Sequence, residues 1–222
     1  MQGKDEKTLA YVLRRTNYGE ADRILNIITP TGKKTVMARG VRKEKSKLAG
    51  GIEMFSLTEL NVHYGKGEFG LVTGAKMKTF YSNLLVDLER MELAAAVLKK
   101  INVLADSSDN PEHFEIVDQV LKNLNAGVDG VLADVWFLMN VARASGEEIN
   151  LYYDADGNKL LPDKKYEWSV MEKSLVERAS GEITANEIKM MRLLIASDLG
   201  VVAKVKDIGA LLPKIYKIAK SL

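Results

Sequence analysis

Residues 54–64 read MFSLTELNVHY and alternate along their whole length. One face of this stretch carries Phe55, Leu57, Glu59, Asn61 and His63, and the other carries Met54, Ser56, Thr58, Leu60, Val62 and Tyr64. An alternation of period two is typical of a β-strand. Gly65-Lys66-Gly67 follows as a turn, and residues 69–79 form the next strand. The stretch therefore predicts one hairpin of an antiparallel sheet.

Three shorter strands are predicted upstream, at residues 9–15, 23–28 and 35–39. These runs are rich in Val, Ile, Leu and Thr, and they are bounded by turns that contain Gly, Pro or Asn. Five short strands within about eighty residues indicate a small closed barrel of the size of an OB-fold.

The middle of the chain indicates helices. Residues 84–104 carry a long apolar pattern without Gly or Pro, and residues 131–144 carry another. Between them, Asp109-Asn110-Pro111-Glu112 is typical of a helix start, with a proline early in the first turn.

The last third mixes both kinds of element. Residues 151–161 predict a hairpin around a turn of Gly, Asp and Asn. A capping box at Thr184 and Glu187 opens a helix that runs to about Ser197. A second helix is expected to begin at Asp207, with an interruption at the following proline.

Together these elements predict an α+β chain. An N-terminal OB-fold β-barrel over residues 1–82 is followed by an all-helical domain over residues 83–222, with a small β-hairpin insertion at about 150–168.

Charge separates the same two parts. Residues 1–82 hold 15 Lys and Arg against 8 Asp and Glu, a net charge of +7, whereas residues 83–222 hold 17 against 22, a net charge of −5. The basic part is the candidate for binding a polyanion.

Composition also excludes several classes of chemistry. The chain has no cysteine, which removes disulfides, thiolate metal sites and cysteine nucleophiles. It has two histidines, His63 and His113, so a zinc site would consist mostly of carboxylates. We therefore expect no metal and no cofactor. No apolar run approaches the ~18 residues that span a bilayer, and no signal peptide is recognised, so we expect a cytoplasmic protein.

A dense basic cluster lies in the first part of the chain and is opposed by Glu44 alone. Two arginines on the first strand add to it, and the candidate nucleic-acid-binding residues are Arg14, Arg15, Lys33, Lys34, Arg39, Arg42, Lys43, Lys45 and Lys47. Several cations on one face can release condensed counterions from DNA or RNA. A solvated loop, the alternative, usually mixes both signs. Aromatic residues are interleaved in the same part, where some can stack on bases and most fill the core: Tyr11, Tyr18, Phe55, Tyr64 and Phe69.

Three motifs of other protein classes fail on their context. The glycine pattern of residues 65–70 matches a dinucleotide-binding loop, but it lies between two strands. Residues 154–158 match part of a calcium loop, but its glycine comes early and no glutamate closes it. Pro162-Asp163 with Glu187-Ile188-Lys189 is similar to a nuclease motif, but that motif requires a strand where we predict a helix. We find no Walker A motif. A metal-dependent nuclease and an OB-fold RNA-binding protein remain the alternatives to a DNA-binding protein.

The chain resembles the RecO family of recombination mediators in the order and spacing of several stretches. The matching stretches are YGEADR (18–23), TPTGK (29–33), ARGVRKEKSK (38–47), LAGG (48–51), GKGE (65–68) and LVT (71–73). The resemblance implies an OB-fold and a helical domain, binding to single- and double-stranded DNA at the nucleoid, and annealing of complementary strands without enzymatic chemistry. It also implies cooperation with RecR in loading recombinase onto DNA coated by single-strand-binding protein.

Two further expectations follow from the resemblance. The helical domain is expected to bind the acidic, Phe-ended tail of single-strand-binding protein, with Lys189 and Arg192 or Lys214 and Lys217 as the cationic rim. Arg192 is the first candidate, because a guanidinium can bind a carboxylate with two hydrogen bonds. Many members of the family carry four cysteines in a zinc ribbon, which this chain lacks. We expect a bare hairpin in its place, held by packing of Tyr152, Tyr153, Tyr166 and Trp168.

Overall fold

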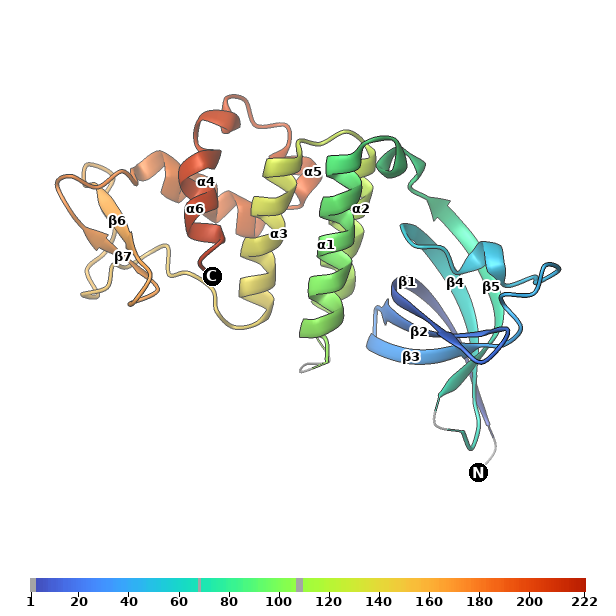
Figure 1. Cartoon of the computed structure of the whole chain (residues 1–222). Coiled ribbons are helices and arrows are strands. Elements are labelled where there is room, and N and C mark those ends of the chain that lie inside the picture. The colour runs from blue at the N-terminus through green and yellow to red at the C-terminus, as the bar shows by residue number, and fades with distance from the viewer. Residues whose placement is uncertain (1–2, 68, 107–109) are drawn as a thin grey trace. The chain divides into compact units, whose positions relative to one another are not determined.

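The computed structural model describes residues 3–67, 69–106 and 110–222 of the chain (Figure 1). These residues form two compact units, Met1–Asn125 and Ala126–Leu222.

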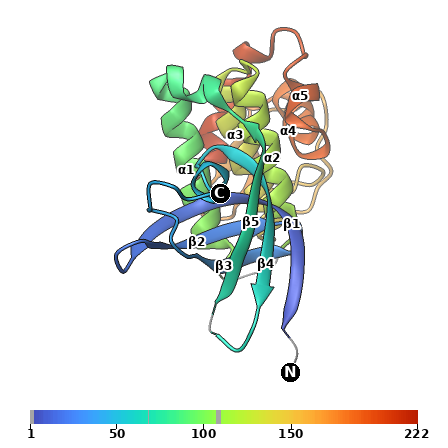
Figure 2. The ribbon, with the colours of Figure 1, turned by 90° about the vertical axis from the view of Figure 1, so that its right-hand side faces the viewer.

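The first unit contains a closed barrel of five strands, in the order β1-β2-β3-β5-β4 (Figures 1 and 2). The strands are β1 (Lys4–Tyr18), β2 (Asp22–Thr29), β3 (Gly32–Ala38), β4 (Ser56–Tyr64) and β5 (Gly70–Phe80). All neighbours are antiparallel except β3 and β5, which are parallel. The five predicted strands and the barrel are confirmed, and β1 extends beyond its predicted bounds at both ends.

In β4, the alternation of residues 54–64 separates a buried face from a more exposed face, as predicted. Leu60 and Val62 are buried in the barrel core, whereas Asn61 between them is exposed. The glycine pattern after β4 is a connection between two antiparallel strands, as predicted. Its Glu68 lies outside the described residues.

Two helices complete the first unit, α1 (Leu88–Leu104) and α2 (Glu112–Asn125). The predicted helix over 84–104 is wrong at its start, because residues Ser82–Val86 form a separate 3-10 turn, η2. Asp87 has extended backbone and its side chain accepts a hydrogen bond from the Arg90 N–H at 3.2 Å, so it caps α1. Asp109 of the second predicted helix start lies outside the described residues.

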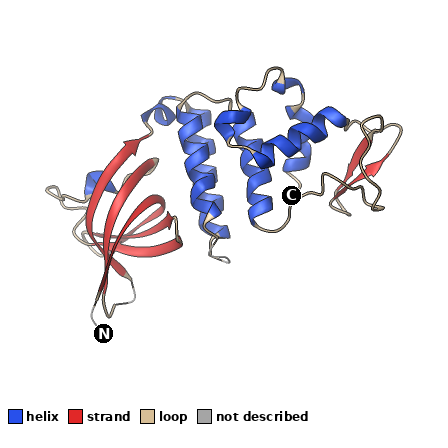
Figure 3. Ribbon diagram, turned by 180° about the vertical axis from the view of Figure 1, so that it is seen from behind, coloured by secondary structure: helices blue, strands red, loops and turns tan. Residues whose placement is uncertain are grey.

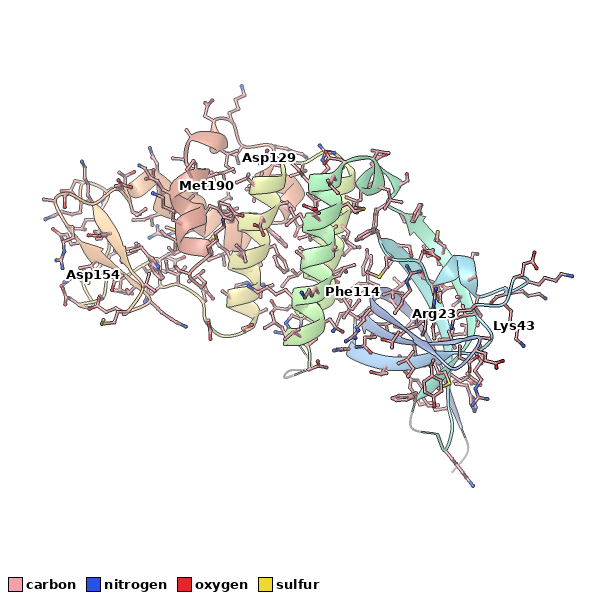
Figure 4. The ribbon with its side chains drawn as sticks, viewed as in Figure 1. Arg23, Lys43, Phe114, Asp129, Asp154 and Met190 are labelled. Atoms are coloured by element: carbon pink, nitrogen blue, oxygen red, sulfur yellow. The ribbon has the colours of Figure 1, made fainter. Side chains whose placement is uncertain are left out.

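Helices α1 and α2 contact the outer side of β1 and β2. Tyr11 of β1 lies between the core residues Ala10 and Val12, and therefore points away from the barrel interior. Its ring contacts Phe114 of α2 at a centroid distance of 5.5 Å, and Phe114 lies on the barrel side of its helix (Figure 4). Helices thus cover the part of this face around Tyr11, so a ligand must bind to another part of the barrel.

His113 of α2 makes the stability of the first unit depend on pH. It is 1% exposed, and burial lowers its pKa from the usual 6.5. In the unfolded chain the ring binds a proton near pH 6.5, and in the folded chain it does so only at lower pH. The free energy of unfolding should therefore be unaffected by His113 above pH 6.5 and fall below it, by up to about 1.4 kcal/mol for each pH unit. Urea unfolding between pH 5 and 8 measures this slope. In a His113→Gln variant, the free energy of unfolding should fall less steeply below pH 6.5. An unchanged slope would contradict the assignment of this pH dependence to His113.

The second unit is mainly helical, with one small sheet (Figure 3). Its elements are α3 (Gly130–Ala144), β6 (Tyr166–Ser169), β7 (Ser174–Glu177), α4 (Ala185–Ala196), α5 (Leu199–Val202), the 3-10 turn η3 (Ile208–Ala210) and α6 (Leu212–Ala219). The capped helix at Thr184 is confirmed as α4. The helix predicted from Asp207 is wrong: α6 starts at Leu212 and Pro213 lies in its first turn, where a missing N–H leaves no bond unmade. Helix α5 was not predicted.

The predicted hairpin at 151–161 is reduced to an isolated bridge between Tyr153 and Lys159. Asp154 organises its turn, because its carboxylate accepts hydrogen bonds from the N–H groups of Asp156 and Asn158 at 3.0 and 2.8 Å. The paired strands are β6 and β7, which lie further along the chain.

The expected packing of this region is right for two of its four aromatic residues. Tyr166 is 1% exposed and its hydroxyl oxygen accepts a hydrogen bond from the Leu161 N–H, and Trp168 donates from Nε1 to the Ser221 hydroxyl at 2.8 Å. Tyr152 and Tyr153 are exposed, so the expectation is wrong for them. The buried aliphatic residues of the region include Leu151, Leu160, Leu175 and Ile183.

Candidate nucleic-acid interface

The connection between β3 and β4 carries most of the basic cluster. Val41 near its start and Ile52 near its end are 3% and 0% exposed, and both belong to the barrel core. The turn before β4 also lies close against β5, because a Cβ on Gly51 would stand 2.8 Å from the Ala75 carbonyl oxygen. Residues 42–47, the basic loop, are therefore anchored on both sides. Figure 4 shows Lys43 extending from this loop away from the barrel.

The turn between β1 and β2 is bonded to the basic loop. The Asp22 carboxylate accepts a hydrogen bond from the Gly40 N–H at 2.7 Å, and the Arg42 N–H donates to the Ala21 carbonyl at 2.9 Å. The Arg42 guanidinium also donates to the Gly19 carbonyl at 3.3 Å. Gly19 and Gly40 have left-handed backbone, with φ of 54° and 62°, which favours glycine at both positions. Two loops distant in sequence thus form one surface.

Six of the nine candidate residues are exposed on or beside the basic loop or in β1. They are Arg14, Arg39, Arg42, Lys43, Lys45 and Lys47. One nitrogen of the Arg42 guanidinium is bonded as described above. Arg15 is partly buried and forms an ion pair with Glu53 at 2.9 Å. The bond between Asp22 and Gly40, which joins the two loops, connects residues distant along the chain and so leaves no local pattern in the sequence.

Lys33 and Lys34 have protein partners instead. Lys34 has the inward register of Val36 and Ala38 in β3, and its ammonium forms an ion pair with Glu6 and lies 5.8 Å from the centroid of the Tyr64 ring. Lys33 has the outward register, and its ammonium donates to the Asn102 carbonyl and to the Asp106 carboxylate at the end of α1. Contact of Lys33 and Lys34 with nucleic acid stays a prediction. The exposed cations named above form the candidate interface.

The candidate partner-binding residues lie in three places in the second unit. Lys189 is exposed on α4. Arg192 donates twice to the Leu151 carbonyl and lies 4.6 Å from the centroid of the Tyr152 ring, so it fastens the segment after α3. Lys214 and Lys217 line a cavity of about 500 Å³ together with Trp168, Val170, Ile183 and Ile218.

The residues of the nuclease motif have a structural role. Glu187 lies in α4, and its carboxylate accepts hydrogen bonds from the Thr184 N–H and hydroxyl in a capping box. Burial raises the pKa of Glu187, but the hydrogen bonds from Thr184 and Lys214 outweigh it and lower the pKa below its usual value. Within the described ranges, His, Asp and Glu side chains gather nowhere in groups of three that could hold a metal ion.

None of the helices in the described ranges combines the length and the apolar character needed to cross a bilayer.

Two family models match the chain in succession. "Recombination protein O N terminal" matches residues 1–81, and "Recombination protein O C terminal" matches residues 86–216. The two matches together cover the barrel and most of the helical part.

Curated relatives carry the name "DNA repair protein RecO". A relative from Roseiflexus sp. (strain RS-1) is 37% identical over 128 residues, which are 57% of this chain and 45% of that protein. One from Dehalococcoides mccartyi (strain ATCC BAA-2266 / KCTC 15142 / 195) is 29% identical over 211 residues, 91% of this chain and 83% of that protein. One from Dehalococcoides mccartyi (strain CBDB1) is 31% identical over 159 residues, 71% of this chain and 62% of that protein. The chain thus spans less than half of the Roseiflexus protein and most of the first Dehalococcoides protein.

Proposed function

Because the chain belongs to the RecO family of DNA repair proteins, we propose that it is a recombination mediator that binds single- and double-stranded DNA and anneals complementary strands. The observation that carries this proposal is the surface formed by the basic loop and the β1–β2 turn. Its cations are exposed and concentrated, and hydrogen bonds join the loop that carries them to the β1–β2 turn.

This surface suits a mechanism without covalent chemistry. Two single strands repel each other through their phosphates, and a cationic surface that holds both lowers that repulsion. Contacts to phosphate leave the base edges free to pair. The mediator then raises the rate of annealing by proximity, and it would act at the nucleoid, where its DNA substrate lies.

The family also supports the proposal that this chain works with RecR and helps to load recombinase onto DNA coated by single-strand-binding protein. A tail ending in Phe requires an apolar pocket with cations at its rim. The cavity beside β6 and α6 has both, with Trp168 and Val170 as apolar walls and Lys217 exposed at the rim. Glu167 and Glu182 also line it, so the cations orient the peptide more than they attract it.

Annealing of complementary oligonucleotides tests the proposed function. The full chain, without nucleotide and with EDTA present, should pair a fluorophore-labelled strand with its quencher-labelled complement faster than the strands pair alone. Added salt should reduce this acceleration, because phosphate contacts weaken as counterions compete. Absence of acceleration would contradict the proposal. Stronger binding to RNA of the same sequence would favour an RNA-binding protein, and cleavage of DNA with Mg²⁺ would favour a nuclease.

The choice of the partner pocket has a separate test. Lys217→Ala should weaken the binding of a labelled acidic peptide ending in Phe by roughly twofold to fivefold, as expected for a partly solvated charge pair. Fluorescence anisotropy measures this change. Lys189→Ala on α4 removes the same charge from an exposed helix face and is the matched control. Loss of peptide binding in Lys189→Ala but not in Lys217→Ala would place the peptide at α4.

A further inference from the structure

Tyr18 is the most exposed aromatic residue that the structure describes in the first unit. Its side chain is 53% exposed, and the next is Phe80 at 41%. Among the other aromatic candidates of the barrel, Tyr11 and Phe55 are buried in the protein. The Tyr18 ring is therefore not part of the barrel core, and it precedes a turn that is bonded to the basic loop.

The strand register places the Tyr18 ring on the same side as the basic loop. Tyr18 is directly opposite Asp22 in the antiparallel pair of β1 and β2, so both side chains project from the same face. On that face the Asp22 carboxylate accepts the hydrogen bond from the Gly40 N–H. The stem of Lys43 lies over the same glycine, because a Cβ on Gly40 would stand 3.7 Å from the Lys43 Cδ.

The neighbouring residues point the other way. Asn17 is opposite Arg23 in the same strand pair, and their side chains are joined by a hydrogen bond from the Arg23 Nε to the Asn17 Oδ1 at 3.2 Å. Successive residues of a strand alternate between faces. The Tyr18 side chain therefore lies on the face of the Asp22 carboxylate, opposite to the face of Asn17 and Arg23.

The backbone that follows the ring is also held in place before any ligand binds. The turn that follows Tyr18 is bonded to the basic loop through the carbonyls of Gly19 and Ala21, both of which accept from Arg42. An aromatic ring offers a flat apolar surface at a small loss of side-chain entropy. An exposed aromatic ring next to cations that can hold phosphates is the arrangement by which proteins bind unpaired bases, since every base has a face that can stack.

We propose that Tyr18 is a base-stacking residue, which binds one unpaired base of single-stranded DNA while the basic loop holds the adjacent phosphates. The inference rests on the proposed DNA-binding function and adds to it a reason for strand preference. Bases in a duplex are stacked on one another and offer no free face, so Tyr18 favours single strands and leaves duplex binding to the cations.

Binding of single-stranded and duplex DNA to the full-length Tyr18→Ala protein tests the inference. The variant should bind a single-stranded oligonucleotide about fivefold to a hundredfold more weakly, which is the range of one lost stacking contact. Its affinity for a duplex of the same length should change by less than about twofold. Tyr18→Trp should retain single-strand binding. 2-Aminopurine in the single strand should be quenched on binding to the parent protein and to Tyr18→Trp, and less so by Tyr18→Ala.

Two variants control for the loss of an exposed aromatic ring in general. Tyr153→Ala removes a tyrosine of similar exposure, 49%, from the second unit, and Phe80→Ala removes the other exposed ring of the barrel. Both should bind single strands like the parent protein. Parental binding of single strands by Tyr18→Ala would overturn the assignment, as would equal losses on single strands and duplex. Failure of the parent protein to bind either DNA would instead overturn the proposed function.

Discussion

Replacing both Arg42 and Lys43 by alanine is expected to weaken binding to single-stranded DNA by about 25-fold near 0.1 M salt. Each phosphate contact on a single strand releases about 0.7 counterion, which near 0.1 M salt corresponds to about 0.7 powers of ten in affinity. Because phosphates carry no sequence information, the loss should be the same for every oligonucleotide sequence.

The dependence on salt identifies this loss as electrostatic. A plot of the logarithm of the binding constant against the logarithm of salt concentration should become shallower by about 1.4. Lys99 and Lys100 provide a matched control, since they are adjacent, exposed cations on α1 of the same unit. Their double alanine variant should keep the parental slope. An unchanged slope for the Arg42 and Lys43 variant would move the interface to another part of the protein.

Tyr11→Ala is expected to lower the free energy of unfolding of the first unit by about 3–5 kcal/mol, the range for removal of a large buried aromatic ring. The Tyr11 hydroxyl donates to the Asp118 carboxylate at 2.6 Å and lies 3.0 Å from the Tyr81 hydroxyl. Burial raises the pKa of Tyr11 far above its usual value, and the hydrogen bonds to Asp118 and Tyr81 raise it further, so the hydroxyl stays protonated as a donor. This residue therefore connects β1 to α2 and to the end of the barrel.

Two substitutions separate the contributions of ring and hydroxyl. Tyr11→Phe keeps the ring and removes the donor to Asp118, and it should lower the free energy of unfolding by about 1–3 kcal/mol. Tyr18→Ala removes an exposed tyrosine from the same strand and should change this free energy by less than about 0.5 kcal/mol. Urea titration followed by circular dichroism measures all three. Equal stability of Tyr11→Ala and Tyr18→Ala would contradict the buried role of Tyr11.

The barrel could be predicted from the sequence because its strands and turns leave local patterns. In β4, period-two alternation sets the buried face directly, and glycines mark the turns around it. The hairpin of β6 and β7 was missed because its turn has no glycine. Lys173 adopts the left-handed backbone there, with φ of 47°, and a lysine gives no turn signal.

The sequence was enough to predict which cations cluster in the candidate interface, but not where their side chains point. The sequence placed the cations in one stretch, yet the register of β3 directs Lys34 to Glu6 inside the barrel end and Lys33 to Asp106 at α1. The predicted strand started at residue 35, too late to reveal that alternation. The bond between Asp22 and Gly40 depends on two loops meeting, and periodicity within one segment contains no information about such a meeting.

The double anchoring of the loop between β3 and β4 bears on how this protein can evolve. Val41 and Ile52 secure the connection to the core, so substitutions of the exposed cations in the basic loop, residues 42–47, alter the surface without disturbing the barrel. Mutations there can adjust the affinity for the ligand while the folded fraction stays constant, whereas mutations at the anchors are removed by selection for stability. Lineages should therefore accumulate changes in the number and spacing of these lysines faster than changes at the two aliphatic anchors.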